Sequence, residues 1–364
     1  NKIYSSIKRV IKQNNFILGK EVFDFENKFK KYCKSKYAIS CSNGTDAITL
    51  AILSLNLKKN SEVIIPAMTY ASTFYAVVNA GLKPILVDIN KKDPLINFDQ
   101  ILDKITIKTR AIIPVHLYGS VVNIQELKNF IKNKNIYIID DCSQAHGALH
   151  LNNKRVGGYK TSDISTFSLY PGKNLGAYGD AGIITTSNLK LSQRIRKIRN
   201  IGASTKFNHE LIGYNNRLDT LQASILIHKI DLLKKLNKKR IRISKRYFSE
   251  IKNPKIKFLN YSPNSVFHQF VIRLKKRNLF TKYLKKNKIE FGFHYPHTIN
   301  QMKYFKKNFG NLKFENAEKL AAECVSLPID PMLKPREVDY IIKILNSSGT
   351  SNVTQIAVSV SGCT

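Results

Sequence analysis

The chain has 364 residues, 43% of them hydrophobic, so it can bury a sizeable core and is not disordered as a whole. It carries 60 Lys and Arg against 25 Asp and Glu, a formal charge of +35. The basic residues are spread along the chain among Asn and Ile, which share A/T-rich codons with Lys. We therefore predict neither a nucleic-acid nor a membrane partner, although the charge can help to attract an anionic substrate.

Short apolar segments alternate with helical patterns over the first half of the chain. This alternation predicts an α/β fold with a mostly parallel sheet covered by helices. The predicted strands are residues 37–41, 62–66, 83–88, 111–115, 136–140, 164–168 and 181–185. The predicted helices between them are residues 44–54, 73–80 and 124–132.

The pattern changes after residue 187. Basic helices are predicted at residues 189–200 and 217–248, followed by a strand at 267–274 and helices at 278–287 and 317–323. We predict a large α/β domain over residues 1–240 with an N-terminal segment, and a smaller C-terminal α+β lobe over 241–346. The stretch 347–364 is rich in Ser, Thr and Gly and has no functional interpretation.

The five cysteines have neither metal-ligand nor redox spacing, which predicts free thiols in a reducing compartment. The beginning of the chain is basic and amphipathic without an apolar signal core. No segment is long and apolar enough to span a bilayer. We expect a cytoplasmic protein without a bound metal.

The strongest chemical signal is Lys173, within the segment SLYPGKNLG that starts at Ser168. The segment follows a predicted strand, and turns at the carboxyl ends of strands are where α/β sheets bind ligands. A Lys in such a turn becomes a nucleophile if its pKa is lowered and a carbonyl group is presented. Taken alone, the segment is better explained as a surface loop that contains one of many lysines.

Three further segments fit the same kind of site. Gly44 and Thr45 begin a helix after a strand, where free amides can bind a phosphate. Asp141 and Gln144 follow a buried strand, and a carboxylate there can pair with a protonated pyridine nitrogen. Tyr70 can stack on a planar ring. Each has an ordinary alternative: a helix cap, a polar turn, and a core or surface tyrosine.

These four segments, in their order along the chain, resemble the DegT/DnrJ/EryC1/StrS family of sugar-nucleotide aminotransferases. Members of that family are fold-type-I enzymes that depend on pyridoxal 5'-phosphate and are similar in fold to aspartate aminotransferase. The resemblance runs from about residue 16 to about residue 345 and includes residues 115–119, 179–182 and 213–219. It implies transfer of an amino group from L-glutamate to a nucleotide-linked keto-sugar. The product would serve the biosynthesis of deoxyamino sugars for surface polysaccharides or glycoconjugates.

The resemblance also implies roles for residues around the cofactor. Lys173 would hold pyridoxal phosphate as a Schiff base and later move the proton. Asp141 would keep the pyridine nitrogen protonated, so that the ring can absorb carbanion charge. Gln144 would lie near the phenolic oxygen, and Tyr70 would stack on the ring.

The phosphate would be bound by Gly44, Thr45 and Ser168, and by Asn215 from the neighbouring subunit. A homodimer with shared active sites follows from that last assignment. The segment with His294 and Tyr295 would lie near the sugar-binding mouth. Arg217 would bind substrate, or else pair with Asp219 or cap the following helix.

The residue after Lys173 carries substrate information within the family. Members that act on 4-keto sugars more often have His there, and this chain has Asn174. The resemblance therefore favours a 3-keto-6-deoxyhexose, linked to dTDP rather than UDP. The alternatives are a sugar dehydratase of the same fold and a regulatory, non-transaminating member. Relatives that are dehydratases replace the lysine by histidine, so Lys173 argues against that alternative, and the intact set of cofactor residues argues against a regulatory protein.

Overall fold

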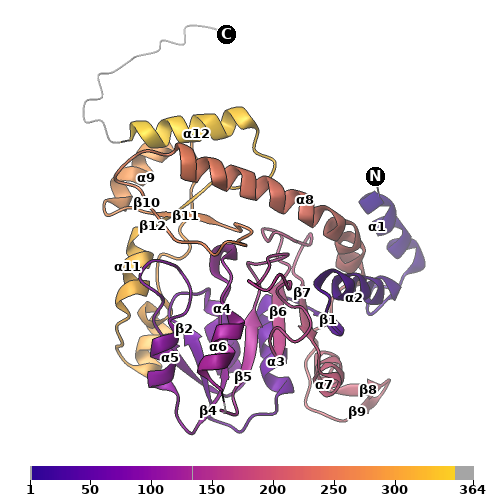
Figure 1. Cartoon of the computed structure of the whole chain (residues 1–364). Helices are drawn as coiled ribbons and strands as arrows, with labels where there is room; N and C mark the ends of the chain where they lie inside the picture. The colour runs from indigo at the N-terminus through magenta and orange to yellow at the C-terminus, as the bar shows by residue number, and fades with distance from the viewer. Residues whose placement is uncertain (1, 133, 349–364) are drawn as a thin grey trace.

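The computed structural model describes residues 2–132 and 134–348. Of the stretch 347–364, only Ser347 and Ser348 belong to the described residues, and Ser347 is the last residue of a helix. The described chain forms a seven-stranded sheet, a three-stranded sheet and a small two-stranded hairpin (Figure 1).

The seven-stranded sheet is built from short runs rich in β-branched and apolar residues. Its strands are β1 (Tyr37–Cys41), β2 (Glu62–Pro66), β3 (Lys83–Val87), β4 (Thr109–Ile112), β5 (Tyr137–Asp141), β6 (Ile164–Ser168) and β7 (Gly182–Thr186). Their order across the sheet is β1-β7-β6-β5-β4-β2-β3. Only β7 runs antiparallel to its neighbours, β1 and β6, so the predicted mostly parallel sheet is confirmed.

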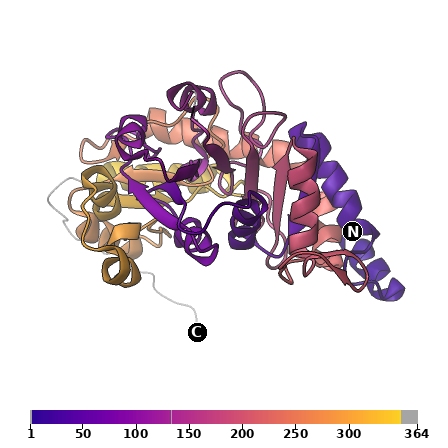
Figure 2. The same ribbon diagram turned by 90° about the horizontal axis from the view of Figure 1, so that it is seen from below.

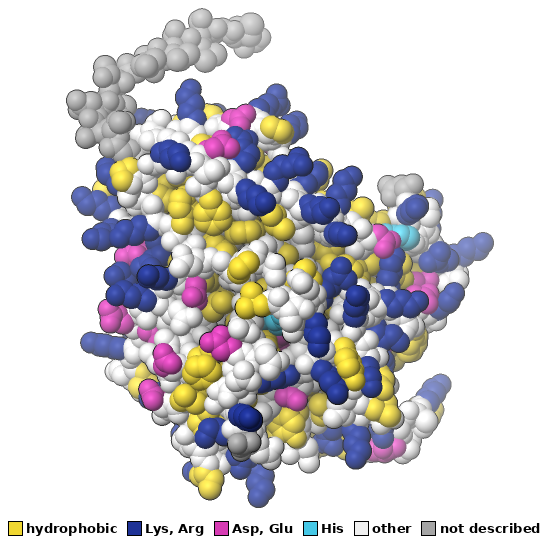
Figure 3. Space-filling view, viewed as in Figure 1, with side chains coloured by type: hydrophobic (Ala, Val, Ile, Leu, Met, Phe, Trp, Pro, Cys, Tyr) yellow, Lys and Arg dark blue, Asp and Glu magenta, His cyan; other side chains and the backbone are white. Residues whose placement is uncertain are grey.

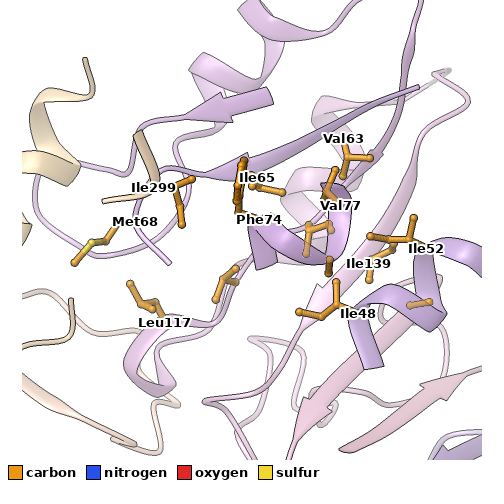
Figure 4. Close-up of a cluster of buried hydrophobic side chains, with 14 of the residues drawn as sticks. Ile48, Ile52, Val63, Ile65, Met68, Phe74, Val77, Leu117, Ile139 and Ile299 are labelled. Atoms are coloured by element: carbon orange, nitrogen blue, oxygen red, sulfur yellow. The ribbon is translucent and has the colours of Figure 1, made fainter. Parts of the chain in front are cut away.

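Both faces of this sheet are covered by helices, as Figure 2 shows. Adjacent strand residues point to opposite faces, so Ile64 and Ile65 belong to different hydrophobic clusters. The cluster around Ile65 packs against α3 and α4 (Figure 4), and it also includes residues of α7. The cluster around Ile64 packs against α5 and α6. The bounds are α3 (Gly44–Ser54), α4 (Ala71–Asn79), α5 (Phe98–Lys104), α6 (Ile124–Phe130) and α7 (Leu189–Arg199).

A 31-residue helix, α8 (Thr220–Glu250), connects the two sheets. Its first half packs with α2 (Lys20–Cys33) over β6 and β7, and α1 (Lys2–Gln13) lies against it. Its second half belongs to the core of the smaller sheet (Figure 1). The predicted domain boundary at residue 240 falls within this helix and stays a prediction.

The smaller sheet contains β10 (Lys257–Phe258), β11 (Phe270–Arg273) and β12 (Cys324–Leu327), all antiparallel. Two helices pack on it, α9 (Arg277–Lys286) and α12 (Pro335–Ser347). The remaining elements are η1 (Leu117–Gly119), β8 (Ala203–Thr205), β9 (Asn208–His209), η2 (Ile299–Gln301), α10 (Lys303–Phe309) and α11 (Glu315–Glu323).

Two predicted boundaries differ from the structure for identifiable reasons. The strand expected at 111–115 is β4, which ends at Ile112 before Pro114, because proline cannot donate a ladder hydrogen bond. The helix expected from residue 217 begins at Thr220, since Asp219 has an extended backbone and is the N-cap.

Lys and Arg side chains are scattered over the face seen in Figure 3 and do not gather in one patch. Among residues 2–132 and 134–348, no helix is long and apolar enough to cross a membrane. The four cysteines in these ranges, Cys33, Cys41, Cys142 and Cys324, are buried free thiols, and Cys363 lies outside them.

Candidate active site

A cavity of about 770 Å³ opens where β1, β2, β5 and β6 have their carboxyl ends. These strands are parallel to one another, so the turns that follow them meet at one place. The cavity is lined by most of the predicted site residues, namely Gly44, Thr45, Tyr70, Asp141, Gln144, Ser168, Lys173, His294 and Tyr295.

Lys173 lies in the turn after β6. Backbone hydrogen bonds from Lys173 N to Tyr170 O (2.9 Å) and from Ala177 N to Leu169 O (2.8 Å) close this turn. Burial lowers the pKa of the Lys173 amine to about 8, and the charge of Asp141 opposes part of the shift. A larger fraction of this amine is therefore unprotonated at neutral pH than in an exposed lysine, and only the unprotonated amine attacks a carbonyl carbon.

Asp141 is the last residue of β5 and is 4% exposed. Thr73 Oγ1 donates a hydrogen bond to its Oδ2 at 3.2 Å, and the amide of Ser143 donates to its Oδ1 at 3.0 Å. These two bonds hold the carboxylate in the cavity wall. A buried carboxylate oriented in this way can accept a hydrogen bond from a protonated ring nitrogen.

A second buried polar cluster lies behind Asp141, on the other face of the sheet. The amide of Val122 donates to His116 Nδ1 at 2.9 Å, so the neutral ring carries its proton on Nε2, which lies 3.0 Å from Asp140 Oδ1. His116, Asp140 and Cys142 offer ligand atoms within 4.8 Å of one another. Because the imidazole and the carboxylate already pair, we assign no metal to them.

The beginning of α3 forms a cradle against the end of β6. Asn43 is the N-cap and its side chain accepts from the amide of Asp46 at 2.8 Å, so the amides of Gly44 and Thr45 remain for a ligand. A Cβ atom on Gly44 would lie 2.4 Å from the Cβ of Ser168, so only glycine fits here. Two free amides beside hydroxyl groups at a helix N-terminus suit a phosphate.

Two aromatic rings and an amide surround the centre of the cavity. The amide of Tyr118 donates to Gln144 Oε1 at 2.7 Å, so Gln144 Nε2 is the donor toward Tyr295 Oη at 3.1 Å. The rings of Tyr70 and Tyr295 lie 5.5 Å apart between centroids. His294 Nδ1 lies 2.7 Å from Ser326 Oγ on β12, which connects this wall to the smaller sheet.

Asn215 and Arg217 do not line the cavity of their own chain. Asn215 is exposed, in the segment that follows the β8–β9 hairpin. Arg217 Nη1 donates to Asn200 Oδ1 at 3.0 Å. Asp219 makes no side-chain cap bond. The predicted roles of Asn215 and Arg217 stay predictions.

The cavity also contains residues that we did not predict, of which His268 and Gln269 come from the chain just before β11. The predicted strand at 267–274 covers them, but hydrophobic spacing carries no signal that this strand returns to the cavity. Ser72 is also new, and its Oγ lies 2.7 Å from Thr45 Oγ1 in the cradle.

Comparison with known proteins adds to these structural observations. The model of the DegT/DnrJ/EryC1/StrS aminotransferase family matches residues 1–346. The chain belongs to this family. It is 40% identical over 353 residues, 95% of each chain, to the dTDP-3-amino-3,6-dideoxy-alpha-D-galactopyranose transaminase of Aneurinibacillus thermoaerophilus. It is 35% identical over 341 residues, 92% of this chain and 91% of the relative, to a pleiotropic regulatory protein of Geobacillus stearothermophilus.

Among solved structures, DesV of S. venezuelae in complex with a ketimine intermediate superimposes with a TM-score of 0.91 at 31% identity, covering 95% of this chain and 94% of that one. This family member is thus a pyridoxal-phosphate-dependent aminotransferase with the predicted fold. The cofactor, when bound, supplies an electron sink for the carbanion formed during amino transfer.

The cavity fits that cofactor. The cradle at Gly44 and Ser168, which a single added Cβ would fill, has the donors that a phosphate needs. The buried carboxylate of Asp141 lines the same cavity as the cradle, and the lowered pKa of Lys173 suits an amine that binds an aldehyde. Residues on this chain would therefore hold the phosphate, the ring nitrogen and the reactive carbon.

Proposed function

We propose that this aminotransferase moves the amino group of L-glutamate to a nucleotide-linked 3-keto-6-deoxyhexose, with dTDP as the favoured nucleotide. The observation that carries the proposal is the cavity that holds Lys173, Asp141 and the Gly44–Ser168 cradle together. The products would be 2-oxoglutarate and a sugar nucleotide that carries a new amino group.

The choice of sugar rests on two observations. The relative at 40% identity is named for a dTDP-linked 3-amino-3,6-dideoxyhexose. Asn174 follows Lys173, as in members similar to this one that act on 3-keto sugars. Deoxyamino sugars of this class are components of surface polysaccharides and glycoconjugates, where we place the product.

Residues of this chain would act at each step of the amino transfer. Lys173 Nζ would bind the cofactor and, once the amino donor has displaced it, would take a proton from the donor carbon and later give one to the sugar carbon. The buried carboxylate of Asp141 would keep the ring nitrogen protonated. Tyr70 would stack on the ring, and Gln144 would lie near the ring's phenolic oxygen. His294, Tyr295 and Arg217 would contact the sugar nucleotide.

We further propose that two copies of the chain form a homodimer in which Asn215 of one copy completes the phosphate site of the other. The exposed position of Asn215, away from its own cavity, supports this arrangement. Cytoplasmic residence fits substrates that are soluble sugar nucleotides.

The second candidate is a regulatory protein without transaminase activity, which the name of one relative suggests for that relative. The lowered pKa of Lys173 and its place beside a buried carboxylate favour catalysis instead. A dehydratase would require another residue in place of Lys173.

The proposal is tested by following the amino group itself. The protein is incubated with pyridoxal phosphate, isotopically labelled L-glutamate and a dTDP-3-keto-6-deoxyhexose, and the sugar nucleotide is analysed by mass spectrometry. We expect one labelled nitrogen in the sugar, less with UDP-linked or 4-keto acceptors, and none with Lys173→Ala. Failure to label any keto-sugar nucleotide, while pyridoxal phosphate is bound, would overturn the proposed function and favour the regulatory candidate.

A further inference from the structure

A chain of buried side-chain hydrogen bonds leads from the long helix α8 to His268 in the cavity wall. Asn237 Nδ2 on α8 donates to the carbonyl of His146 at 2.8 Å. Asn174 Nδ2 donates to Asn237 Oδ1 at 2.9 Å and to the carbonyl of Val266 at 3.3 Å. Asn174 Oδ1 lies 3.2 Å from His268 Nδ1. Asn174, Asn237 and His268 are each at most 8% exposed.

The direction of every bond in this chain follows from its two backbone ends. A backbone carbonyl only accepts, so the amide nitrogen of Asn237 must face His146 and its oxygen must face Asn174. The amide nitrogen of Asn174 must then face Asn237 and Val266, which leaves its oxygen for His268. That oxygen can only accept, so the proton of His268 is on Nδ1 and its Nε2 carries a lone pair.

This imidazole also stays neutral. Burial lowers the pKa of His268 well below its ordinary value, and the positive charge of Lys173 is the next contribution in size. His268 and Lys173 line the same cavity. Within the described residues no protein group hydrogen-bonds to His268 Nε2. This atom is also not among the fully buried side-chain atoms that lack a partner, so it is accessible from the cavity. The cavity therefore contains a fixed acceptor near the catalytic amine.

The chemistry of the proposed substrates limits what can meet this acceptor. The carboxylates of glutamate and the diphosphate of a sugar nucleotide only accept hydrogen bonds, and a lone pair repels them. The amino group of glutamate is the group that is transferred, so it is not free to donate to His268. The remaining donors are the hydroxyl groups of the hexose and the N–H and hydroxyl groups of the nucleoside. Of these, the hexose carries the reacting carbon and must lie beside Lys173, in the cavity that His268 also lines. It enters the cavity only in the second half of the reaction.

We propose that His268 Nε2 accepts a hydrogen bond from a hexose hydroxyl beside the reacting carbon, and that Asn174 is the positioning residue that fixes the required tautomer. The inference rests on the proposed function and adds a residue that acts on the sugar acceptor alone. His268→Asn keeps a donor for Asn174 but removes Nε2, whereas His268→Gln places an acceptor oxygen near the former position of Nε2.

Measuring the two half-reactions separately distinguishes a sugar-binding role of His268 from a structural role, which would affect both. Each is followed in single turnovers by the absorbance of the cofactor, first with L-glutamate and then with a dTDP-3-keto-6-deoxyhexose. For His268→Asn we expect the efficiency of the sugar half-reaction to fall by about tenfold, the effect of one lost hydrogen bond. The glutamate half-reaction should stay within about twofold of wild type, since glutamate offers no free donor to Nε2. His268→Gln should recover most of the loss.

Two controls sharpen the result. His150→Asn removes another buried imidazole, one that does not line the cavity, and should leave both half-reactions unchanged. A deoxy-sugar acceptor that lacks the contacted hydroxyl should react with wild type as poorly as the natural acceptor does with His268→Asn. Its rate should not fall further in the variant.

The tautomer of His268 can be measured directly. Histidine nitrogen NMR, assigned with the His268→Asn spectrum, should show a neutral Nδ1–H ring for His268.

Equal losses in both half-reactions, or no loss in either, would overturn the assignment of His268 while leaving the proposed function intact. An Nε2–H ring would also overturn it. If wild type accepts glutamate but no keto-sugar, the proposed function itself fails, and the assignment of His268 fails with it.

Discussion

Gly44 at the beginning of α3 packs so closely against Ser168 at the end of β6 that a methyl group on Gly44 would lie 2.4 Å from the Ser168 Cβ. This contact places the free amides of the helix next to the serine hydroxyl. The phosphate site therefore depends on the absence of a side chain at residue 44, and its first test is to add one.

Gly44→Ala should weaken the binding of pyridoxal phosphate by roughly tenfold or more, since overpacking of this kind costs about 1–3 kcal/mol. The measurement is a titration of the cofactor's visible band. Adding Ser168→Gly to Gly44→Ala removes the atom that clashes and should recover part of the affinity. Unchanged affinity in Gly44→Ala would show that the cofactor phosphate binds elsewhere.

The lowered pKa of Lys173 predicts a pH profile for cofactor loading. Only the unprotonated amine reacts, so the rate at which the lysine-bound band forms should rise with pH around a midpoint of about 8. Asp141→Asn removes a negative charge that favours the protonated amine, so its midpoint should be lower than that of wild type. A wild-type midpoint near that of an ordinary lysine, about 10.4, would contradict the burial of this amine.

Asp141→Asn should also separate cofactor binding from catalysis. The amide leaves Lys173 free to bind the cofactor but cannot hold a positive charge on the ring nitrogen. We expect the glutamate half-reaction to slow on the order of a hundredfold to a thousandfold, as for other lost electrostatic partners of a developing charge. A variant that binds the cofactor and reacts at the wild-type rate would remove Asp141 from the mechanism.

The shared active site predicts complementation between two inactive subunits. A dimer of one Asn215→Ala chain and one Lys173→Ala chain contains one site with both residues intact and one with neither. Mixed dimers purified with two tags should therefore have about half of the wild-type activity per dimer, because one of two sites is complete. If Asn215 serves its own chain, the mixed dimer has no complete site and its activity will not exceed the mean of the two parents.

Glu26 on α2 predicts a stability effect away from the cavity. Burial raises the pKa of Glu26, but the charges of Arg199 and Arg196 together with hydrogen bonds from Ser40 and Arg199 outweigh burial, and the net pKa is lowered. Arg199 Nη1 lies 2.6 Å from Glu26 Oε1. Glu26→Gln should lower the free energy of unfolding at neutral pH by about 3–5 kcal/mol, as expected when one member of a buried pair is removed.

The sign of the pH dependence follows from that lowered pKa. The contribution of Glu26 is present above the unfolded value of 4.5 and is lost as the pH falls through the lower folded value. The difference in the free energy of unfolding between wild type and Glu26→Gln, measured by urea unfolding, should therefore become smaller in acid. Glu210→Gln, at an exposed pair with Lys197, is the control and should change little. A difference that widens in acid would contradict the pairing.

Much of this molecule could be predicted from its sequence because local patterns carry the information. The strands at 37–41, 62–66 and 164–168 and the helix at 44–54 have the predicted bounds, since apolar runs and caps define them. The sequence predicts the turn with Lys173 because this turn follows such a strand. Their meeting at one cavity follows from the parallel order of the strands.

The rest depends on contacts between distant parts of the chain. His268 reaches the cavity through its bond to Asn174, 94 residues earlier, and nothing in the spacing of either segment indicates that bond. The sequence predicts an end for β4 that is too late, because the apolar run continues past Pro114 while the strand ends at Ile112. The role of Asn215 would lie between two copies of the chain, which a pattern within one chain does not reveal.

In the proposed function, one cavity performs both halves of an amino transfer to a keto-sugar, with Lys173 as the catalytic amine. The most direct test is the absorbance spectrum of the protein with pyridoxal phosphate, after L-glutamate and again after a dTDP-3-keto-6-deoxyhexose. We predict a visible band that glutamate converts to a near-ultraviolet band and that the keto-sugar restores, with no such band in Lys173→Ala. A band that no amino donor alters, or one that persists in Lys173→Ala, would show that Lys173 does not catalyse an amino transfer in this cavity.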